Sequence, residues 1–218
     1  MNTILKLTLV SIVILISSIS ASAQDFNTEK FNEKLFQQKG GLINRIRLMN
    51  DYICFMTDKS KTQATRDYYR KKALSLFIGK GYEYEENGVT KRGVMMQTTS
   101  VNRPGVVTNT LLRDYFSRLV NLRYSEVKIT STEIADMKVS DLKKVDSSDG
   151  KTLYMCTVQY VQYFRGEYAD GYVYADKTTK RIVCYVEVEE VESDVYGKPK
   201  FEYMIMLGDV EALHTERS

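Results

Sequence analysis

The sequence predicts an α+β protein in which three helices pack on an antiparallel sheet. Apolar residues recur every three or four positions over residues 42–78 and again over 112–122, which is typical of amphipathic helices. From about residue 124 onward, apolar and polar residues alternate, which is typical of strands with one covered face. A chain of 218 residues with 43% hydrophobic and 27% charged residues has an ordinary globular composition, unlike a disordered chain or a small disulfide scaffold.

The first 23 residues predict a signal peptide. Lys6 is followed by an apolar run over 7–16 and by Ala21-Ser22-Ala23, the order of charge, apolar core and small residues that a signal peptidase recognises. The apolar run is shorter than the ~20 residues that span a bilayer, so we expect no transmembrane anchor after cleavage. The sequence therefore predicts an exported bacterial protein, periplasmic or extracellular, with 195 residues and a net charge of +2.

Two helices are expected after an N-terminal arm at residues 24–41. Spacings of four, three, four and three residues place one set of side chains on a single helix face: Leu42, Ile46, Met49, Ile53 and Met56. Residues 58–62 interrupt this pattern and supply candidate N-caps for a second helix that runs to Ile78. Gly79-Lys80-Gly81 ends that second helix.

A hairpin and a third helix follow. The alternating residues 82–85 lead to Asn87-Gly88, a strong two-residue turn signal, and Val94-Met95-Met96 is expected to return as the second strand. Residues 102–105 break this strand. A helix starting near Thr108 or Asn109 is predicted from an apolar stripe made of Leu112, Tyr115, Phe116, Leu119 and Leu122.

The remainder is expected to form an antiparallel meander. Its strands are predicted over 125–135, 152–165, 169–176, 180–191 and 200–208. Its connections are predicted at 146–150, near Gly166, at Asp176–Lys180 and at 196–199. Alternation is clearest in the fourth strand, which puts Ile182, Cys184, Val186 and Val188 on one face.

This order of helix, helix, hairpin, helix and four or five strands resembles the NTF2-like superfamily. The resemblance covers residues 42–213, as one domain over 42–218, and rests on element order because the superfamily has no shared sequence motif. It implies a curved sheet that folds around the helices as a cone with an internal pocket. The arm and the strand at 200–208 depart from the minimal pattern, and no catalytic residue is carried over.

Cysteine and histidine are scarce, which limits the chemistry. The single histidine, His214, lies near the C-terminus, and the three cysteines are scattered, so we expect neither a metal site nor a cofactor. Cys54, Cys156 and Cys184 are interpreted as small buried hydrophobic residues, with a Cys156–Cys184 bridge as the alternative in an oxidising compartment.

Tyrosine is abundant, with 16 residues, many of them in the predicted strands. Tyrosine combines a large apolar ring with a polar tip, so it suits a ligand pocket, although it also simply favours half-buried strand positions. The predicted pocket lining consists of Tyr52 and Met56 on the first helix and Tyr154 and Tyr160 on the strand expected beneath it.

No acidic residue stands out as a catalytic base. Glu133 and Asp114 are conceivable, whereas most carboxylates fall in surface runs. The basic and aromatic residues over 66–72 are interpreted as a solvated helix face, because nucleic-acid binding needs a larger positive excess, so no nucleic-acid partner is expected.

Three functions remain open from the sequence. The first is an exported non-enzymatic binding module that holds a small apolar ligand or a partner protein in the cell envelope. The second is a pocket enzyme of the isomerase or dehydratase type that uses a buried carboxylate and a tyrosine. The third is an assembly component that docks through the strand edge near residues 200–208, and a homodimer through the sheet is a further expectation.

Overall fold

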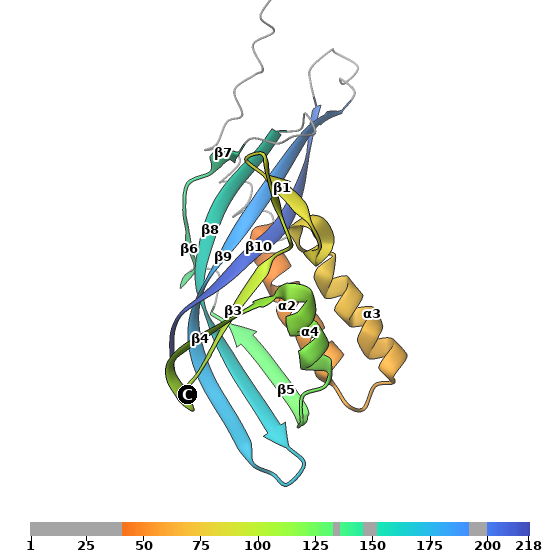
Figure 1. Ribbon diagram of the computed structural model, residues 1–218, viewed down its shortest axis with the longest axis vertical. Helices are drawn as coiled ribbons and strands as arrows, with labels where there is room; N and C mark the ends of the chain where they lie inside the picture. Colours follow the sequence, from red (N-terminus) through yellow and green to blue (C-terminus); the bar gives the residue numbers. More distant parts are fainter. Residues whose placement is uncertain (1–40, 133–135, 146–151, 192–199) are drawn as a thin grey trace, which may run out of the picture.

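The computed structural model describes residues 41–132, 136–145, 152–191 and 200–218. The predicted signal peptide, all but the last residue of the predicted arm, and Glu133 lie outside the described residues. The described residues contain three α-helices, which are α2 (Leu42–Thr57), α3 (Gln63–Leu74) and α4 (Leu112–Val120), and a short 3-10 helix at Ile78–Gly81 (Figure 1). None of the helices in the described ranges is both long and apolar enough to cross a membrane.

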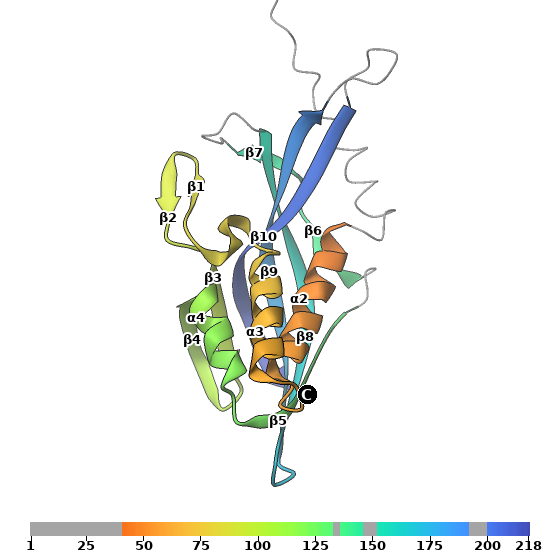
Figure 2. The same ribbon diagram turned by 90° about the vertical axis from the view of Figure 1, so that its right-hand side faces the viewer.

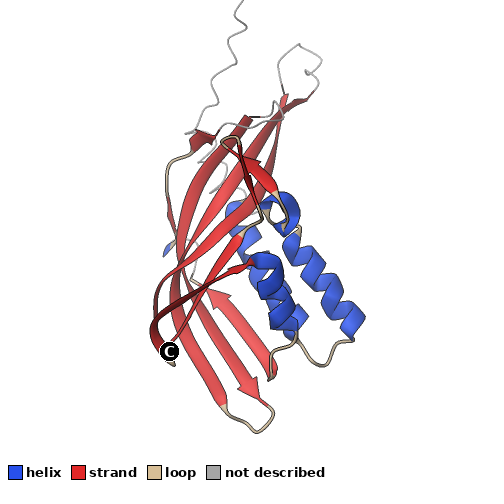
Figure 3. Cartoon of the chain, in the orientation of Figure 1, coloured by secondary structure: helices blue, strands red, loops and turns tan. Residues whose placement is uncertain are grey.

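One large sheet carries the three helices on one side (Figures 2 and 3). Its central path runs β4-β3-β10-β9-β8-β5, and β6 and β7 pair with β8 outside that path. The strands of the path are β3 (Met95–Ser100), β4 (Arg103–Leu111), β5 (Tyr124–Ser131), β8 (Thr152–Tyr168), β9 (Val173–Val191) and β10 (Lys200–Arg217). The short additional strands are β6 (Lys138–Val139) and β7 (Lys143–Val145). The predicted fold class of three helices packed on a curved sheet is confirmed, and β5, β8, β9 and β10 form the expected meander.

The sheet is mixed rather than purely antiparallel. β10 runs parallel to β3, with Val210 opposite Met96, whereas every other pairing in the path is antiparallel. This parallel pairing joins an early hairpin to the last strand of the chain. The β3–β4 hairpin therefore becomes part of the surface that faces the helices.

The core lies between the sheet and the predicted faces of the helices. Ile46, Met49, Ile53 and Met56 of α2 are buried, as their spacing predicts, and α2 lies against β5 and β10. Phe116 of α4 is also buried and packs edge-on against Phe77, with ring centroids 6.1 Å apart. Burying such side chains contributes about 1.5–3 kcal/mol each, so this layer supplies the main stabilisation of the fold.

The turn at Asn87-Gly88 is confirmed, because it joins β1 (Tyr84–Glu86) to β2 (Val89–Lys91) with positive φ at both residues. The predicted return of this hairpin over Val94–Met96 is wrong. Those residues lead into β3, which belongs to the large sheet.

The sequence did not predict β4, in which residues 103–111 form a strand despite Pro104 and Gly105. The third helix therefore begins at Leu112 rather than at residue 108 or 109. β4 is an edge strand, where a proline is tolerated.

The predicted turn at Asp176–Lys180 is also wrong. These residues lie inside β9, a continuous strand of 19 residues, so the strands predicted over 169–176 and 180–191 belong to a single strand. The turn predicted near Gly166 is wrong as well, because Gly166 lies within β8 and the chain turns at 169–172. β10 likewise extends to Arg217, so His214 is part of a strand, although its side chain is exposed. Both strands are longer than predicted because the meander continues them past polar residues.

The three cysteines are free thiols. Cys156 and Cys184 are both buried and lie directly opposite each other on β8 and β9. Cys54 is partly buried, and its sulfur accepts a hydrogen bond from the Ile129 backbone N–H at 3.3 Å. The interpretation of these residues as buried small side chains fits the two strand cysteines, which appear as an unbridged pair.

Candidate functional site

The helix-facing side of β9 changes from apolar to polar along one strand. Side chains two residues apart share a face of a sheet, so Asp176, Thr178 and Lys180 lie on the same face as Ile182 and Cys184. Asp176 is only 7% exposed, and Thr178 and Lys180 are each 6% exposed. Buried charged residues are unusual unless they are paired or functional, which makes this segment the first candidate for a site.

A directed chain of hydrogen bonds leads from the β3–β4 hairpin to Asp176. The Asn102 backbone N–H donates to Ser100 Oγ at 3.2 Å, and Ser100 Oγ lies 2.9 Å from the Tyr174 hydroxyl. Tyr174 donates its proton to Asp176 Oδ2 at 2.6 Å. Since the tyrosine proton points at the carboxylate, the Ser100 proton points at the tyrosine oxygen. All the hydrogens therefore point from the hairpin towards Asp176.

Burial perturbs the ionisable groups around this chain. Loss of solvent raises the pKa of Asp176, and hydrogen bonds from Tyr174 and Thr178 and the charge of Lys180 offset only part of that effect. Burial also lowers the pKa of Lys180 to about 8, against the opposing attraction of Asp176. Tyr115 of α4 faces the same cluster, and burial together with the Asp176 charge raises the pKa of Tyr115 to about 12. A carboxylate and an amine with pKa values shifted towards neutrality are typical of functional sites.

Hydroxyl groups fix the hairpin to the two central strands. Thr215 of β10 hydrogen-bonds to Thr99 of β3 and, at 2.9 Å, to Thr178 of β9. Beside them, Gln162 of β8 donates to Asn50 of α2 at 2.9 Å, and both residues are buried. These hydrogen bonds join β3, β9 and β10 to one another and β8 to α2, around the Ser100–Tyr174–Asp176 chain.

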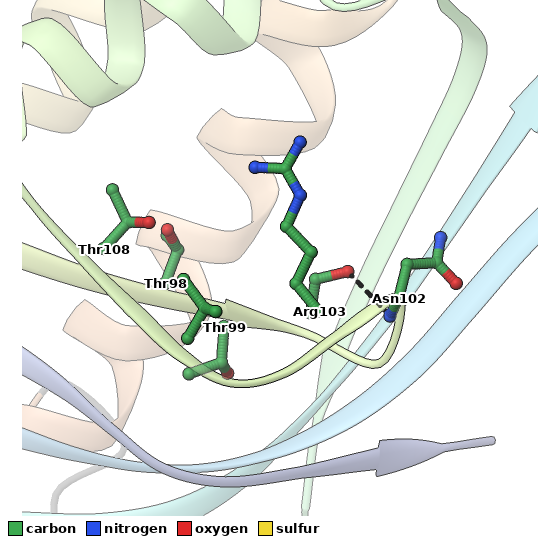
Figure 4. A pocket seen from close by; sticks show the side chains of 7 residues that line it. Thr98, Thr99, Asn102, Arg103 and Thr108 are labelled. Atoms are coloured by element: carbon green, nitrogen blue, oxygen red, sulfur yellow. Dashed lines mark hydrogen bonds between the residues drawn. The ribbon is translucent and has the colours of Figure 1, made fainter.

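A cavity of about 420 Å³ opens at the β3–β4 hairpin (Figure 4). Its lining is mostly polar: Thr98, Thr99, Ser100, Asn102, Arg103, Val106 and Thr108. Figure 4 shows the Arg103 side chain projecting from the hairpin on the side where the Thr98 and Thr108 hydroxyls lie. Ser100 both lines the cavity and contacts Tyr174, so it connects the cavity to the buried carboxylate.

The four predicted pocket residues lie elsewhere, and none lines this cavity. Tyr160 comes nearest to the site: it is 2% exposed and lies directly opposite Lys180. Met56 is buried in the α2 core, and Tyr52 packs against Tyr69 of α3, with ring centroids 6.0 Å apart. Tyr154 is half-buried, on the same face of β8 as Tyr160 but beyond Cys156.

Sequence reasoning missed Ser100, Arg103, Tyr174, Asp176 and Lys180. A signal for three of them was present, because Tyr174, Asp176 and Lys180 continue backwards the alternation that was recognised over 182–188. The turn-forming character of Asp176–Lys180 obscured it. Asp114, which the sequence suggested as a conceivable base, lies exposed in the first turn of α4.

A second tyrosine–carboxylate pair exists away from the cavity lining. The Tyr185 hydroxyl donates to Glu86 Oε1 at 2.5 Å, and Glu86 also faces Lys91 at 3.5 Å. Tyr185 points to the opposite face of β9 from Asp176, because their sequence separation is odd. This pair joins the β1–β2 hairpin to the sheet and provides an internal comparison for the Tyr174–Asp176 pair.

Within the described ranges, no group of three or more histidine, cysteine or acidic side chains is arranged to hold a metal.

Fold and site together define an α+β protein with three helices on one side of a large mixed sheet and a polar, ligand-sized cavity beside a buried carboxylate. A scan against protein-family models finds no match, and no curated protein matches the sequence. Among solved structures, the chain is similar to one named "Putative Scytalone Dehydratase from Novosphingobium aromaticivorans DSM 12444". The two chains are 13% identical with a TM-score of 0.32, over 88% of this chain and 90% of the other. The fold described above rests on strand pairing and helix packing, not on this likeness.

Proposed function

We propose that this protein binds a small polar molecule in the cavity at the β3–β4 hairpin and transfers a proton between that molecule and Asp176. The observation that carries this proposal is the hydrogen-bond chain from the cavity wall at Ser100, through Tyr174, to the buried Asp176 carboxylate. A proton transferred by a positioned side chain accelerates a reaction by about 10²–10⁴-fold.

The chain of hydroxyls gives the proton a defined route. A proton leaving the bound molecule is accepted at Ser100 Oγ, while the Ser100 proton passes to Tyr174 and the Tyr174 proton passes to Asp176. The net result is one proton lost by the ligand and one gained by the carboxylate. The reverse sequence returns the proton to another atom of the ligand, which is an isomerisation, or to a leaving hydroxyl, which is a dehydration.

The environment of Asp176 suits both directions. Burial raises the pKa of Asp176, which makes the carboxylate a stronger base than one in water and its acid form easier to populate near neutral pH. The positive charge of Lys180 interacts with Asp176 and stabilises its ionised form, so the carboxylate can also act as a base.

The lining of the cavity favours a polar ligand over the small apolar ligand expected from the sequence. Only Val106 among the lining residues is apolar, and an apolar molecule would cover the hydroxyl and amide groups without replacing their hydrogen bonds to water. The expected export places this chemistry in the envelope or outside the cell, and that location remains part of the proposal.

Deuterium exchange tests proton transfer directly. Small enolisable ketones and oxo acids are incubated with the protein in D₂O, and deuterium uptake at carbon is followed by NMR. We expect faster exchange with wild-type protein and a loss of about 10²–10⁴-fold in the Asp176→Asn variant, which keeps the shape of the side chain. Tyr185→Phe is the matched control, because it removes a tyrosine–carboxylate hydrogen bond on the other face of β9.

Two results would contradict this proposal in different ways. If wild-type protein bound the compounds but exchanged none of them faster than Asp176→Asn does, the protein would be a binding module without catalytic activity. An equal loss of exchange in Tyr185→Phe would show that the effect follows from general destabilisation and not from the Ser100–Tyr174–Asp176 chain.

A further inference from the structure

We propose that the cavity recognises a carboxylate group of its ligand through Arg103, so that the substrates are small hydroxy- or oxo-carboxylic acids. This inference rests on the proposed function and names the ligand class for the same cavity. It is carried by the position of Arg103, by its lack of a protein partner, and by the composition of the wall around it.

Arg103 lies directly across the hairpin from the start of the proton route. It is the first residue of β4, and its register partner on β3 is Ser100. Directly opposite side chains on an antiparallel pair have Cβ atoms about 4.5–5.5 Å apart and share a face. A ligand held by the Arg103 guanidinium therefore lies beside Ser100, with its remaining atoms within reach of the hydroxyl that leads to Asp176.

The Arg103 guanidinium has no counterion in the part of the chain that the structure describes. Arg103 is exposed, and no side-chain hydrogen bond or salt bridge joins it to another described residue, although arginines such as Arg181, Arg70 and Arg165 pair with carboxylates. Among the described residues, the cavity wall contains no acidic side chain, and Arg103 is its single charged group. A positive charge at the wall of a cavity, without an internal partner, is complementary to an anion.

The chemistry of the wall favours a carboxylate among anions. The planar guanidinium matches the two oxygens of a carboxylate with two parallel hydrogen bonds. The five neutral polar residues of the lining supply hydroxyl and amide groups that suit the hydroxyl or carbonyl oxygen of the same ligand. A cavity volume of about 420 Å³ suits a small molecule.

Binding of levulinate and of its methyl ester to the purified protein tests this inference. The two probes share an enolisable ketone and differ in the negative charge. We expect levulinate to bind at least tenfold more tightly than methyl levulinate by calorimetry, and to shift the side-chain NMR signal of Arg103. Arg103→Gln should lose this tenfold preference, and Arg103→Lys should lose most of it because lysine lacks the planar pair of donors. Arg181→Gln is the matched control, since Arg181 pairs with Glu211 on the opposite face of the sheet.

Several results would overturn the inference. Equal binding of the acid and the ester, unchanged levulinate binding in Arg103→Gln, or no binding of either probe would each exclude carboxylate recognition by Arg103. Inorganic phosphate is the third probe, and binding as tight as that of levulinate would assign a general oxyanion site instead.

Deuterium exchange measured with the same two probes separates this inference from the proposed function. Arg103-dependent binding of levulinate without deuterium exchange would support the ligand class and contradict proton transfer. Asp176-dependent exchange into methyl levulinate at an undiminished rate would support proton transfer and contradict the ligand class.

Discussion

Two halves of the same strand face are equally buried but chemically opposite. In β9, Ile182 and Cys184 are fully buried and pack in the core, whereas Asp176 and Lys180, a few residues earlier, are 7% and 6% exposed. Removing a charged group from water costs several kcal/mol, whereas burying an aliphatic side chain contributes about 1.5–3 kcal/mol. Burial alone therefore does not distinguish the part of the face that stabilises the fold from the part that is suited to chemistry. The partners of the buried groups make that distinction.

Replacing Ile182, in the apolar half of the β9 face, should have the largest effect on the stability of the protein. Ile182 is fully buried between Val158 of β8 and Val210 of β10. We expect Ile182→Ala to lower the free energy of unfolding by about 3 kcal/mol, because it removes buried methylene groups and leaves a cavity. Urea unfolding measures this loss. The rate of deuterium exchange per folded molecule of Ile182→Ala should stay close to that of wild type. A loss of exchange as large as that of Asp176→Asn would contradict the functional difference between the two halves of the β9 face.

Lys180→Met should change the pH dependence of stability. The pKa of Lys180 is lowered by burial from 10.5 to about 8, so between these values the unfolded chain binds more protons than the folded chain. Stability contributed by this group therefore rises with pH from about 8 to about 10.5 and is lowest below 8. We expect the free energy of unfolding of wild type, relative to Lys180→Met, to rise by about 1.4 kcal/mol per pH unit in this window. Urea unfolding at closely spaced pH values measures it, and a constant difference would mean that Lys180 titrates normally.

Tyr174→Phe should interrupt the proton route while the aromatic ring continues to fill its place in the site. The variant keeps the ring but removes the hydroxyl that joins Ser100 to Asp176. We expect deuterium exchange to fall by about 10–100-fold, which is less than for Asp176→Asn because the carboxylate remains. Tyr185→Phe is again the reference, and equal rates in the two tyrosine variants would remove Tyr174 from the proposed route.

Tyr160→Phe should have the smallest effect and the opposite sign. The Tyr160 hydroxyl is buried and has no hydrogen-bond partner among the described residues, so its removal leaves no other group unsatisfied. We expect the free energy of unfolding to increase by about 1 kcal/mol, because an unsatisfied buried polar group is costly. Thermal unfolding measures it. A decrease would show that the hydroxyl has a partner of its own, such as a bound ligand atom retained through purification.

The helices and the apolar half of the sheet could be predicted because they depend on local spacing. Met49, Ile53 and Met56 are three or four residues apart on α2, and Ile182 and Cys184 are two apart on β9, so burial follows directly from the periodicity. The same rule failed for β4, where a proline and a glycine occur in an exposed edge strand.

The candidate site could not be predicted in the same way. Ser100 and Tyr174 are 74 positions apart and meet only because β10 pairs in parallel with β3 and beside β9. No local pattern specifies that pairing. Asp176, Thr178 and Lys180 alternate in the same register as the apolar residues of the strand predicted over 180–191. Polar residues placed in this way indicate a strand with a polar inner face as readily as they indicate a turn.

The continuity of β9 through residues 174–180 also has an evolutionary consequence. In a connecting loop, relatives can gain or lose residues with little effect, as we expect for the tight turn over 169–172. Inside a strand, a single inserted or deleted residue would turn every side chain on one side of it to the opposite face. Homologous proteins that keep this chemistry should therefore show no length variation between Tyr174 and Lys180, and should retain the spacing Tyr-x-Asp-x-Thr-x-Lys even where the intervening residues differ.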